Sequence, residues 1–338
     1  MPKPFRWAII GASDIAATRM IPAMRRLGQE PVVVMSTDPA RAAEYAGTHG
    51  IEQSTTSLGH ALAAEVDAVY ISTTNELHAA QLRAAIAAGR HVLCEKPLAL
   101  TVDEAQDAVV AAAQAGVVLG TNHHLRSGPA IRCLRQAVTD GTVGRLLAVR
   151  VSHAVLLPER LRGWRLDTSP GAGVILDITV HDVDAVRFVT GLEVLDVAAV
   201  GLSQGMAQGT TADAVMVACR LTEEVGMQIH AAYTAPHAVT CLEVHGSDGS
   251  LYAKKSLRQE PDGDVVLSRF GRDDVALDVA DREGLYDRTL RIFADAVSGG
   301  GEPTATGVDG VRSLAVALAI QRSAQGGQTV HVQYPAPA

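Results

Sequence analysis

The sequence predicts an α/β protein whose N-terminal part is a doubly wound parallel sheet and whose C-terminal part is an α+β domain with an open, mostly antiparallel sheet. Short apolar runs alternate with Ala/Leu-rich segments of helical period over about the first 120 residues, which is typical of βαβ units. Beyond about residue 123 the runs lengthen and apolar residues recur at every second position, as in antiparallel strands with one covered face. The 338 residues exceed the usual length of a single hydrophobic core, so two domains are expected, 1–122 and 123–338.

Composition and charge narrow the class of protein. Hydrophobic residues make up 47% and charged residues 20% of the chain, as in an ordinary globular protein. The formal charge is −8 and no long run of like charges occurs, so nucleic acid is not expected as a partner. No apolar stretch is long enough for a signal peptide or a membrane span, and a soluble, cytoplasmic protein is expected. The cysteines show no metal-binding spacing, which favours free thiols: Cys94, Cys133, Cys219 and Cys241.

The elements of the N-terminal domain follow from apolar runs and capping residues. Strands are expected at the runs RWAII, PVVVMS, DAVYIST, HVLCE and VVLGTN. Asn75 precedes the helical segment ELHAAQLRAAIAAG, in which Gly89 is suited to end the helix. Thr101 and Glu104 have the spacing of a capping box that opens a helix running to Gly116.

The C-terminal domain is expected to begin with a helix, AIRCLRQAVTDG, and to continue mainly as strands. The strand runs are LLAVRVSHAVLL, VLDVAAVGL, AVMVACRL, GMQIHAAYT, CLEVHGSDGSLYA and DVVLSRF. The segment ILDITVHDVDAVRFVTG interrupts them and places Asp177, His181, Asp184 and Phe188 at helical spacing. A closing helix is expected at GVRSLAVALAIQRSA. No repeat or low-complexity linker marks the domain boundary, which therefore depends on the change of period alone.

The segment IIGASDIAAT, residues 9–18, joins a strand-like run to a helical one, as a dinucleotide-binding fingerprint does. Gly11 would permit the tight turn and Ala16 is small enough for helix and strand to pack. Ser13 replaces the usual second glycine, but its hydroxyl can donate to a phosphate oxygen beside the helix N-terminus. An ordinary strand-to-helix turn remains the alternative, because the fingerprint alone is weak.

The end of the second strand, STDPAR, favours NADP(H) over NAD(H). Ser36 and Thr37 carry no charge to repel a 2′-phosphate, and Arg41 could bind one in a bidentate manner. Asp38 is the counter-argument, because an acidic residue there can accept from the ribose 2′-hydroxyl. Its place before Pro39 also suits a helix N-cap, and we favour that interpretation. Arg41 as an ordinary exposed arginine is the other alternative.

Two further motifs, STTNELH and CEKPLAL, each lie just after a parallel strand, at the edge of an open α/β sheet where ligands bind. Together with GTNHHLR, GWRL, GVILDITVHD and the closing TGVDGVRSLAVALAIQRSA, they resemble the glucose-fructose oxidoreductase, inositol dehydrogenase and rhizopine-catabolism (Gfo/Idh/MocA) family of oxidoreductases, nearly end to end. The resemblance implies a Rossmann cofactor domain and an open-sheet domain that can pack against a second subunit. It also implies hydride transfer between a nicotinamide and a carbinol or carbonyl carbon of a sugar-like ring.

The family's catalytic pair corresponds by this resemblance to Lys96 and His181, with Asp177 one helical turn before His181. Reduction of a ketone builds negative charge on its oxygen, so the site needs a proton donor and a nearby cation. We favour His181 as the acid and Lys96 as the electrostatic partner, and the reverse assignment stays open. Asp177 would orient the imidazole or a sugar hydroxyl. The simpler interpretations are a solvated loop lysine and a structural histidine.

The remaining candidates follow from the same motifs. The residues expected at the cofactor are Gly11, Ser13, Asp14, Ile15, Ser36, Thr37, Arg41, Ser72, Thr73, Thr74, Asn75, His78, Glu95, Lys96 and Asn122. Those expected at the substrate are Lys96, His153, Trp164, Arg165, Asp177 and His181. Trp164 could instead serve packing, His78 could be a surface helix residue, and His153 a half-buried strand histidine. Hydride transfer requires no metal, and no histidine group has ligand spacing, so no metal site is expected.

The function that the resemblance implies is an NADPH-dependent reduction of the C2 ketone of a cyclic keto sugar. One alternative is an NAD(P)-dependent dehydrogenase of another sugar, a polyol or a dihydrodiol. A second is a non-catalytic NADP-sensing protein, against which Lys96, Asp177 and His181 argue, because a sensor needs neither an acid nor a cation. The open sheet face makes a homodimer possible.

Overall fold

The computed structural model describes residues 3–336, which form two compact units. The first unit contains the N-terminal segment up to His123, the segment Tyr286–Val311 and the C-terminal residues from Pro335. The second contains His124–Leu285 and Arg312–Tyr334. The division after His123 lies next to the expected boundary. However, the segment 286–311, which the sequence analysis included in the C-terminal domain, packs within the first unit.

In the first unit the described residues form a parallel sheet with the strand order β3-β2-β1-β4-β5-β6. The strands are β1 (Arg6–Ile10), β2 (Glu30–Met35), β3 (Gln53–Thr55), β4 (Ala68–Ile71), β5 (His91–Cys94) and β6 (Leu119–Thr121). The central strands read as continuous apolar runs because helices cover both faces, and every residue of β4 is buried. The doubly wound parallel sheet predicted from the sequence is confirmed.

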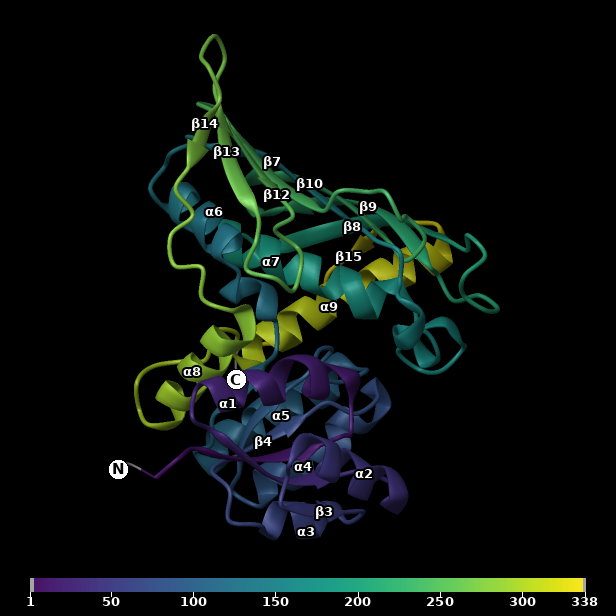
Figure 1. Ribbon diagram of the computed structural model, residues 1–338. Helices are drawn as coiled ribbons and strands as arrows, with labels where there is room; N and C mark the ends of the chain where they lie inside the picture. Colours follow the sequence, from purple (N-terminus) through teal and green to yellow (C-terminus); the bar gives the residue numbers. More distant parts are fainter. Residues whose placement is uncertain (1–2, 337–338) are drawn as a thin grey trace. The chain divides into compact units, whose positions relative to one another are not determined.

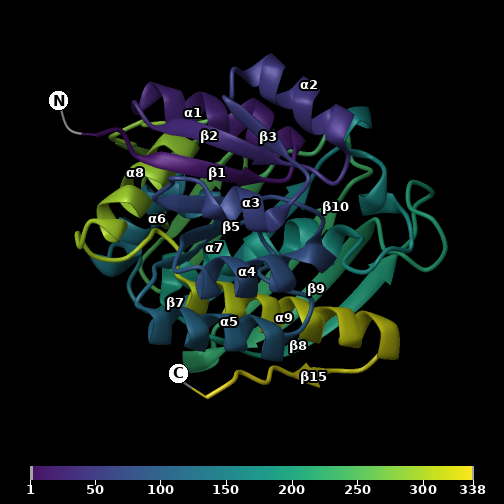
Figure 2. The same ribbon diagram turned by 90° about the horizontal axis from the view of Figure 1, so that it is seen from below.

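Helices connect the parallel strands by crossovers, which are almost always right-handed. They are α1 (Ile21–Arg26), α2 (Pro39–His49), α3 (Leu58–Ala63), α4 (His78–Ala87) and α5 (Val102–Ala115). The first unit also includes most of a later helix, α8 (Leu285–Val297), which connects none of these strands. The strand order reverses its direction after β3, so α1 and α2 lie on the face opposite α4 and α5 (Figure 2).

Most of the expected helix ends are present. The Thr101 hydroxyl accepts from the amide of Glu104 at 3.2 Å, and Gly116 ends α5 in the left-handed conformation, as predicted. Gly89, after α4, has a φ of +68°. The helix expected directly after Asn75 begins later than predicted. Asn75 is the first residue of a short 3₁₀ turn, Asn75–Leu77, which has no side-chain cap, and α4 begins only at His78.

The second unit contains a mixed sheet with the order β14-β13-β12-β11-β7-β10-β9-β8-β15 among the described residues. Its strands are β7 (Leu146–Ala154), β8 (Val194–Leu202), β9 (Ala214–Leu221), β10 (Gly226–Ala232), β11 (Cys241–Gly246), β12 (Ser250–Lys254), β13 (Asp264–Ser268), β14 (Val275–Leu277) and β15 (Val330–His331). Only β7 and β10 pair in parallel, so the predicted open, mostly antiparallel sheet is confirmed for this part of the chain.

Helices cover one face of this sheet (Figure 1). They are α6 (Pro129–Thr139), a π-helical turn (Ile175–Thr179) that continues into α7 (Val180–Thr190), and α9 (Gly307–Gly326), within which the division between the units falls after Val311. The sheet alternates accordingly: along β9, Val217 and Cys219 face the helices while Met216, Ala218 and Arg220 are exposed. The other face of the sheet is therefore open.

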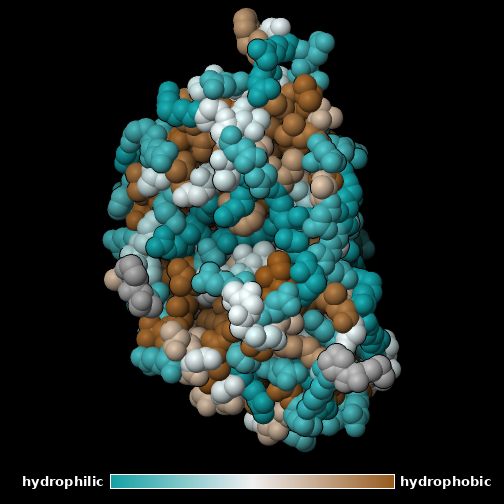
Figure 3. Space-filling model, turned by 90° about the vertical axis from the view of Figure 1, so that its left-hand side faces the viewer, coloured by the Kyte–Doolittle hydropathy of each residue, from teal (hydrophilic) through white to brown (hydrophobic). Residues whose placement is uncertain are grey.

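The surface mixes polar and apolar side chains, as the space-filling view shows for one side of the molecule (Figure 3). No helix within residues 3–336 is both long enough and apolar enough to cross a bilayer. Nor do the described residues include a group of His, Cys, Asp and Glu side chains that could hold a metal ion. All four cysteines are free thiols, and three of them are buried.

Candidate active site

The loop after β1 contains a position that only glycine can occupy. Gly11 has a φ of +108°, and a Cβ atom there would lie 2.8 Å from the carbonyl carbon and oxygen of Ser72. Both the backbone conformation and the close approach of the loop after β4 therefore require the missing side chain. This is the role that the fingerprint assigns to its first glycine. Asp14 and Ile15 then form the first residues of the following helix.

Ser13 works as a cap in this loop. Its hydroxyl accepts from the amide of Ala16 at 3.2 Å and donates to the hydroxyl of Ser72 at 2.8 Å. The hydroxyl thus ties the loop after β1 to the loop after β4 and satisfies one amide of the helix start. A cofactor phosphate that accepts a hydrogen bond from the Ser13 hydroxyl would replace Ser72 as its acceptor.

Helix α2 holds the same loop through its carbonyl groups. A guanidinium nitrogen of Arg41 donates to the carbonyl of Ala12 at 2.7 Å, and the Tyr45 hydroxyl donates to the carbonyl of Ser13 at 2.9 Å. Two successive carbonyl oxygens are therefore engaged by α2. Tyr45 and its contact were not anticipated from the sequence, because nothing in the loop itself indicates which helix residue reaches it.

The end of β2 supports the cap interpretation of Asp38. Its carboxylate accepts from the amides of Ala40 and Arg41 at 2.8 and 3.2 Å, and Pro39 opens the helix, as predicted. Ser36 is buried and Thr37 is exposed. The glycine-only turn, the helix start and an edge of uncharged side chains beside Arg41 fit a nicotinamide dinucleotide.

His78 joins the two loops that follow β4 and β5. It is fully buried, and its ring nitrogens lie 2.8 Å from the carbonyl of Pro97 and 3.3 Å from that of Thr73. Burial lowers the pKa of His78, so the neutral ring donates one hydrogen bond, and the shorter distance assigns it to Pro97. His78 is therefore buried between the two loops and holds the loop after β5 at Pro97, instead of lying on the surface.

Lys96 is held from both sides along the chain. One carboxylate oxygen of Glu95 accepts from the Tyr70 hydroxyl at 2.6 Å and from the amide nitrogen of Asn122 at 2.5 Å. Burial raises the pKa of Glu95, while the hydrogen bond from Tyr70 and the charge of Lys96 oppose that shift. On the other side of Lys96, His78 contacts the carbonyl of Pro97. The backbone of Lys96 is therefore positioned by the contacts of Glu95 and Pro97, without its own side chain.

In the second unit, Asp177 is the centre of a small polar network. It lies in the π-helical turn before α7, and its Oδ2 atom accepts from the Arg165 guanidinium at 3.0 Å and from the Tyr233 hydroxyl at 2.9 Å. Arg165 also stacks over the ring of Trp164, with 4.7 Å from its guanidinium carbon to the ring centroid. The structure thus brings together Trp164, Arg165 and Asp177 and adds Tyr233 to them.

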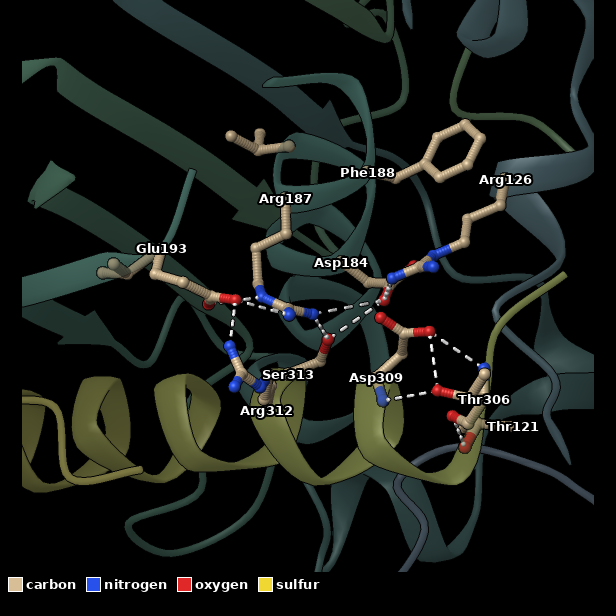
Figure 4. Close-up of polar contacts among 12 residues, drawn as sticks. Thr121, Arg126, Asp184, Arg187, Phe188, Glu193, Thr306, Asp309, Arg312 and Ser313 are labelled. Atoms are coloured by element: carbon tan, nitrogen blue, oxygen red, sulfur yellow. Dashed lines mark hydrogen bonds and ion pairs between the residues drawn. The ribbon is translucent and has the colours of Figure 1, made fainter. Parts of the chain in front are cut away.

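His181 lies one helical turn after Asp177 and is 7% exposed. Its ring meets that of His124 edge-on, with 4.8 Å between the centroids. Two residues after His124, Arg126 forms a bidentate ion pair with Asp184 of α7, at 2.7 and 2.8 Å (Figure 4). Ser313 donates to the same carboxylate at 3.0 Å, so this network fixes the segment carrying His124 against the helix carrying His181.

His153, on β7, contacts a carboxylate that the sequence analysis did not select. Its Nδ1 atom lies 2.6 Å from Oδ1 of Asp182, the residue after His181. Asp182 is completely buried, and the histidine side chain is 12% exposed. The contact was missed because the two residues are 29 positions apart and belong to elements of different period.

Comparison with known proteins gives consistent relationships. The model of an oxidoreductase family with an NAD-binding Rossmann fold, GFO/IDH/MocA, matches residues 5–123, and the GFO/IDH/MocA C-terminal domain model matches residues 131–252. A 1,5-anhydro-D-fructose reductase of Ensifer adhaerens is 48% identical over 97% of this chain and 98% of its own. The D-xylose 1-dehydrogenase (NADP(+)) 2 of Haloferax volcanii is 27% identical over 96% and 99%. A structure of levoglucosan dehydrogenase with NADH has a TM-score of 0.87 at 24% identity, covering 98% of this chain and 100% of its own, which shows the shared fold.

Proposed function

The chain belongs to the GFO/IDH/MocA family of oxidoreductases, and from this we propose that it reduces the C2 ketone of 1,5-anhydro-D-fructose, or of a close cyclic keto sugar, with NADPH. The product would be 1,5-anhydro-D-mannitol. The observation that carries the proposal is the 48% identity with a 1,5-anhydro-D-fructose reductase over 97% of the chain. The set of Lys96, Asp177 and His181 is the chemistry that such a reduction needs.

The cofactor side of the proposal is NADP(H). The bound nicotinamide supplies the hydride. The loop after β1 would hold the pyrophosphate, with Gly11 allowing its close approach to the backbone. Ser36, Thr37 and Arg41 would bind the 2′-phosphate by donating hydrogen bonds to it. The carboxylate of Asp38 does not compete for this position, because it caps α2. Arg41 would then exchange or share its bond to the carbonyl of Ala12.

On the substrate side, His181 would give its proton to the carbonyl oxygen while the ammonium of Lys96 stabilises the negative charge that develops there. The reverse assignment of the two roles remains the alternative within the same proposal. Asp177, held by Arg165 and Tyr233, would orient the imidazole or a sugar hydroxyl. Trp164 offers an apolar surface for a sugar ring and Arg165 a hydroxyl donor.

An assay of NADPH consumption tests the function. With 1,5-anhydro-D-fructose we expect turnover in the ordinary range for enzymes, on the order of 1–1000 per second, and a single epimeric product identified by NMR. A panel of polyols and dihydrodiols with NAD and NADP is the comparison. Oxidation of one of these in preference would favour the dehydrogenase alternative. Cofactor binding without turnover of any keto sugar would favour the sensor alternative.

The choice of cofactor is tested by Ser36→Asp. A carboxylate at the end of β2 would repel the 2′-phosphate and accept from a ribose hydroxyl, so we expect affinity for NADPH to fall by about tenfold or more and affinity for NADH to rise. Titration of nicotinamide fluorescence measures both. Ser54→Asp, which adds the same charge to an exposed position of the neighbouring β3, is the matched control. Tighter binding of NADH than of NADPH by the parent protein would overturn the assignment.

We also propose that the open face of the second unit's sheet can pair with a second copy of the chain. Val200 of β8 and Met216 of β9 are opposite each other in the register and are 60% and 42% exposed. Exposed apolar side chains next to each other on a sheet are typical of a contact surface.

The four free thiols fit a reducing compartment such as the cytoplasm.

A further inference from the structure

We propose that Asp182 is a positioning residue for His153, and that it holds this imidazole with Nε2 available for a hydroxyl group of the substrate. The proposal rests on the proposed function, since it assigns a further hydrogen-bonding group to the same sugar. It adds a histidine–carboxylate pair to the residues proposed at the substrate, which already include His181 and Asp177.

The contact between the two residues is short and shielded. Nδ1 of His153 lies 2.6 Å from Oδ1 of Asp182, whose side chain is fully buried. The other carboxylate oxygen, Oδ2, has no hydrogen-bond partner among the described residues. His153 is thus the hydrogen-bonding partner that the structure gives to this carboxyl group. A buried carboxylate with a single partner holds that partner firmly, because losing it would leave the charge uncompensated.

This arrangement decides which ring nitrogen carries a proton. A carboxylate accepts, so Nδ1 of His153 must be the donor in the pair, and Nε2 is left for another group. Burial raises the pKa of Asp182, while the charge and hydrogen bond of His153 oppose that shift. While the carboxyl group of Asp182 is ionised, Nδ1 is therefore the protonated nitrogen that faces it. An imidazole fixed in this way presents one defined nitrogen to a ligand.

His153, on β7, and Tyr233, directly after the adjacent strand β10, lie on the same face of the sheet. In the parallel pairing of β7 and β10, His153 is opposite Ala231, and Tyr233 follows two residues later on the same face. Tyr233 donates to Asp177, and His153 contacts Asp182, so adjacent strands send matching contacts to one helical segment. Charged or titratable side chains on other elements that contact this helical segment include Arg165, His124, Arg126 and Arg135.

The alternative is that the pair only pins β7 to α7. Such a role would lower the free energy of unfolding when either residue is changed, but it would leave KM for the keto sugar unchanged in variants that still fold. A positioning role predicts a higher KM for the sugar in the same variants, because Asp182 would then act through the imidazole. The double-mutant cycle tests whether the two residues act together, and KM measured beside the free energy of unfolding separates the two interpretations.

The experiment compares His153→Ala, Asp182→Ala and the double variant with 1,5-anhydro-D-fructose and NADPH. We expect each single change to lower kcat/KM by about 10- to 100-fold, mainly through KM, as for the loss of a hydrogen bond in a charged network. The double variant should lose less than about threefold beyond His153→Ala. Asp182→Asn keeps an acceptor for Nδ1 and should retain part of the activity. A further loss in the double variant equal to that of Asp182→Ala alone would overturn the proposal.

A second measurement does not depend on turnover. The ¹⁵N shifts of the His153 ring in the parent protein should show a protonated Nδ1, and Asp182→Ala should change them. An unprotonated Nδ1 in the parent would overturn the proposal, even if Asp182→Ala fails to fold. If the parent reduces no keto sugar, the proposed function fails while the ring shifts still decide the role of Asp182. His331→Ala is the matched control, since His331 contacts Asp196 at 2.9 Å but is 69% exposed.

Discussion

We expect Lys96→Met and His181→Ala each to lower kcat by at least about 100-fold, because general acid catalysis and electrostatic stabilisation of an alkoxide each supply roughly that factor or more. Lys96→Met keeps nearly the length of the lysine side chain and removes its charge. His181→Ala removes the imidazole that would donate the proton. The affinity for NADPH, measured by fluorescence titration, should change much less than turnover. Single-turnover measurements with 1,5-anhydro-D-fructose then assign the loss to the chemical step.

The positions of these residues make the test specific. Lys96 lies between Glu95, which Tyr70 and Asn122 hold, and Pro97, whose carbonyl meets His78. Its backbone is therefore fixed without the ammonium, and Lys96→Met should keep the fold. Exposed residues of the same types supply controls in Lys254→Met and His237→Ala. Turnover within threefold of the parent in both variants would contradict the assigned pair. A much larger loss for Lys96→Met would favour Lys96 as the proton donor.

The periods of the apolar residues were enough to predict most of the fold. The runs VLDVAAVGL and AVMVACRL coincide with β8 and β9, because a long strand with one covered face repeats its pattern several times. The run CLEVHGSDGSLYA, expected as one strand, forms the two antiparallel strands β11 and β12. The strands that were missed altogether, β3, β14 and β15, have three, three and two residues. They lie toward or at the edges of their sheets, where so few residues show no period. The return of the segment 286–311 to the first unit was missed because a helical period does not indicate a packing partner.

Local chemistry predicted part of the candidate site. The glycine-only turn at Gly11 and the cap at Asp38 were predicted because each depends on residues close by in the sequence. Tyr233 and Asp182 were not, since they meet Asp177 and His153 across 56 and 29 residues of chain. Strand pairing and helix packing create such contacts, and the sequence of either segment alone carries no signal of them. The roles of Lys96 and His181 came from family resemblance and remain predictions.

The buried ion pair of Arg126 and Asp184 is another contact between distant parts of the sequence, and it holds the segment of His124 against α7. The side chains of Arg126 and Asp184 are 7% and 1% exposed, and Arg126 also lies over the ring of Phe188. Arg187 extends the network, bonding to Ser313 and to Glu193, as Figure 4 shows. Ion pairs at such depth contribute little compared with apolar residues of the same volume, but losing one member is costly. Both members also lie close in sequence to the imidazole pair of His124 and His181.

We therefore expect Arg126→Ala and Asp184→Ala each to lower the free energy of unfolding by about 3–5 kcal/mol, because each leaves a buried charge without its bidentate partner. Urea denaturation followed by circular dichroism and by the fluorescence of Trp164, the tryptophan of this unit, measures the change. The double variant Arg126→Met with Asp184→Leu removes both charges, so it should recover most of the loss. Arg258→Ala breaks an ion pair whose side chains are 44% and 40% exposed, and it should cost less than about 1 kcal/mol. If the buried and exposed variants cost the same, the network does not hold the histidine segment against α7, and His181 must be positioned by other contacts.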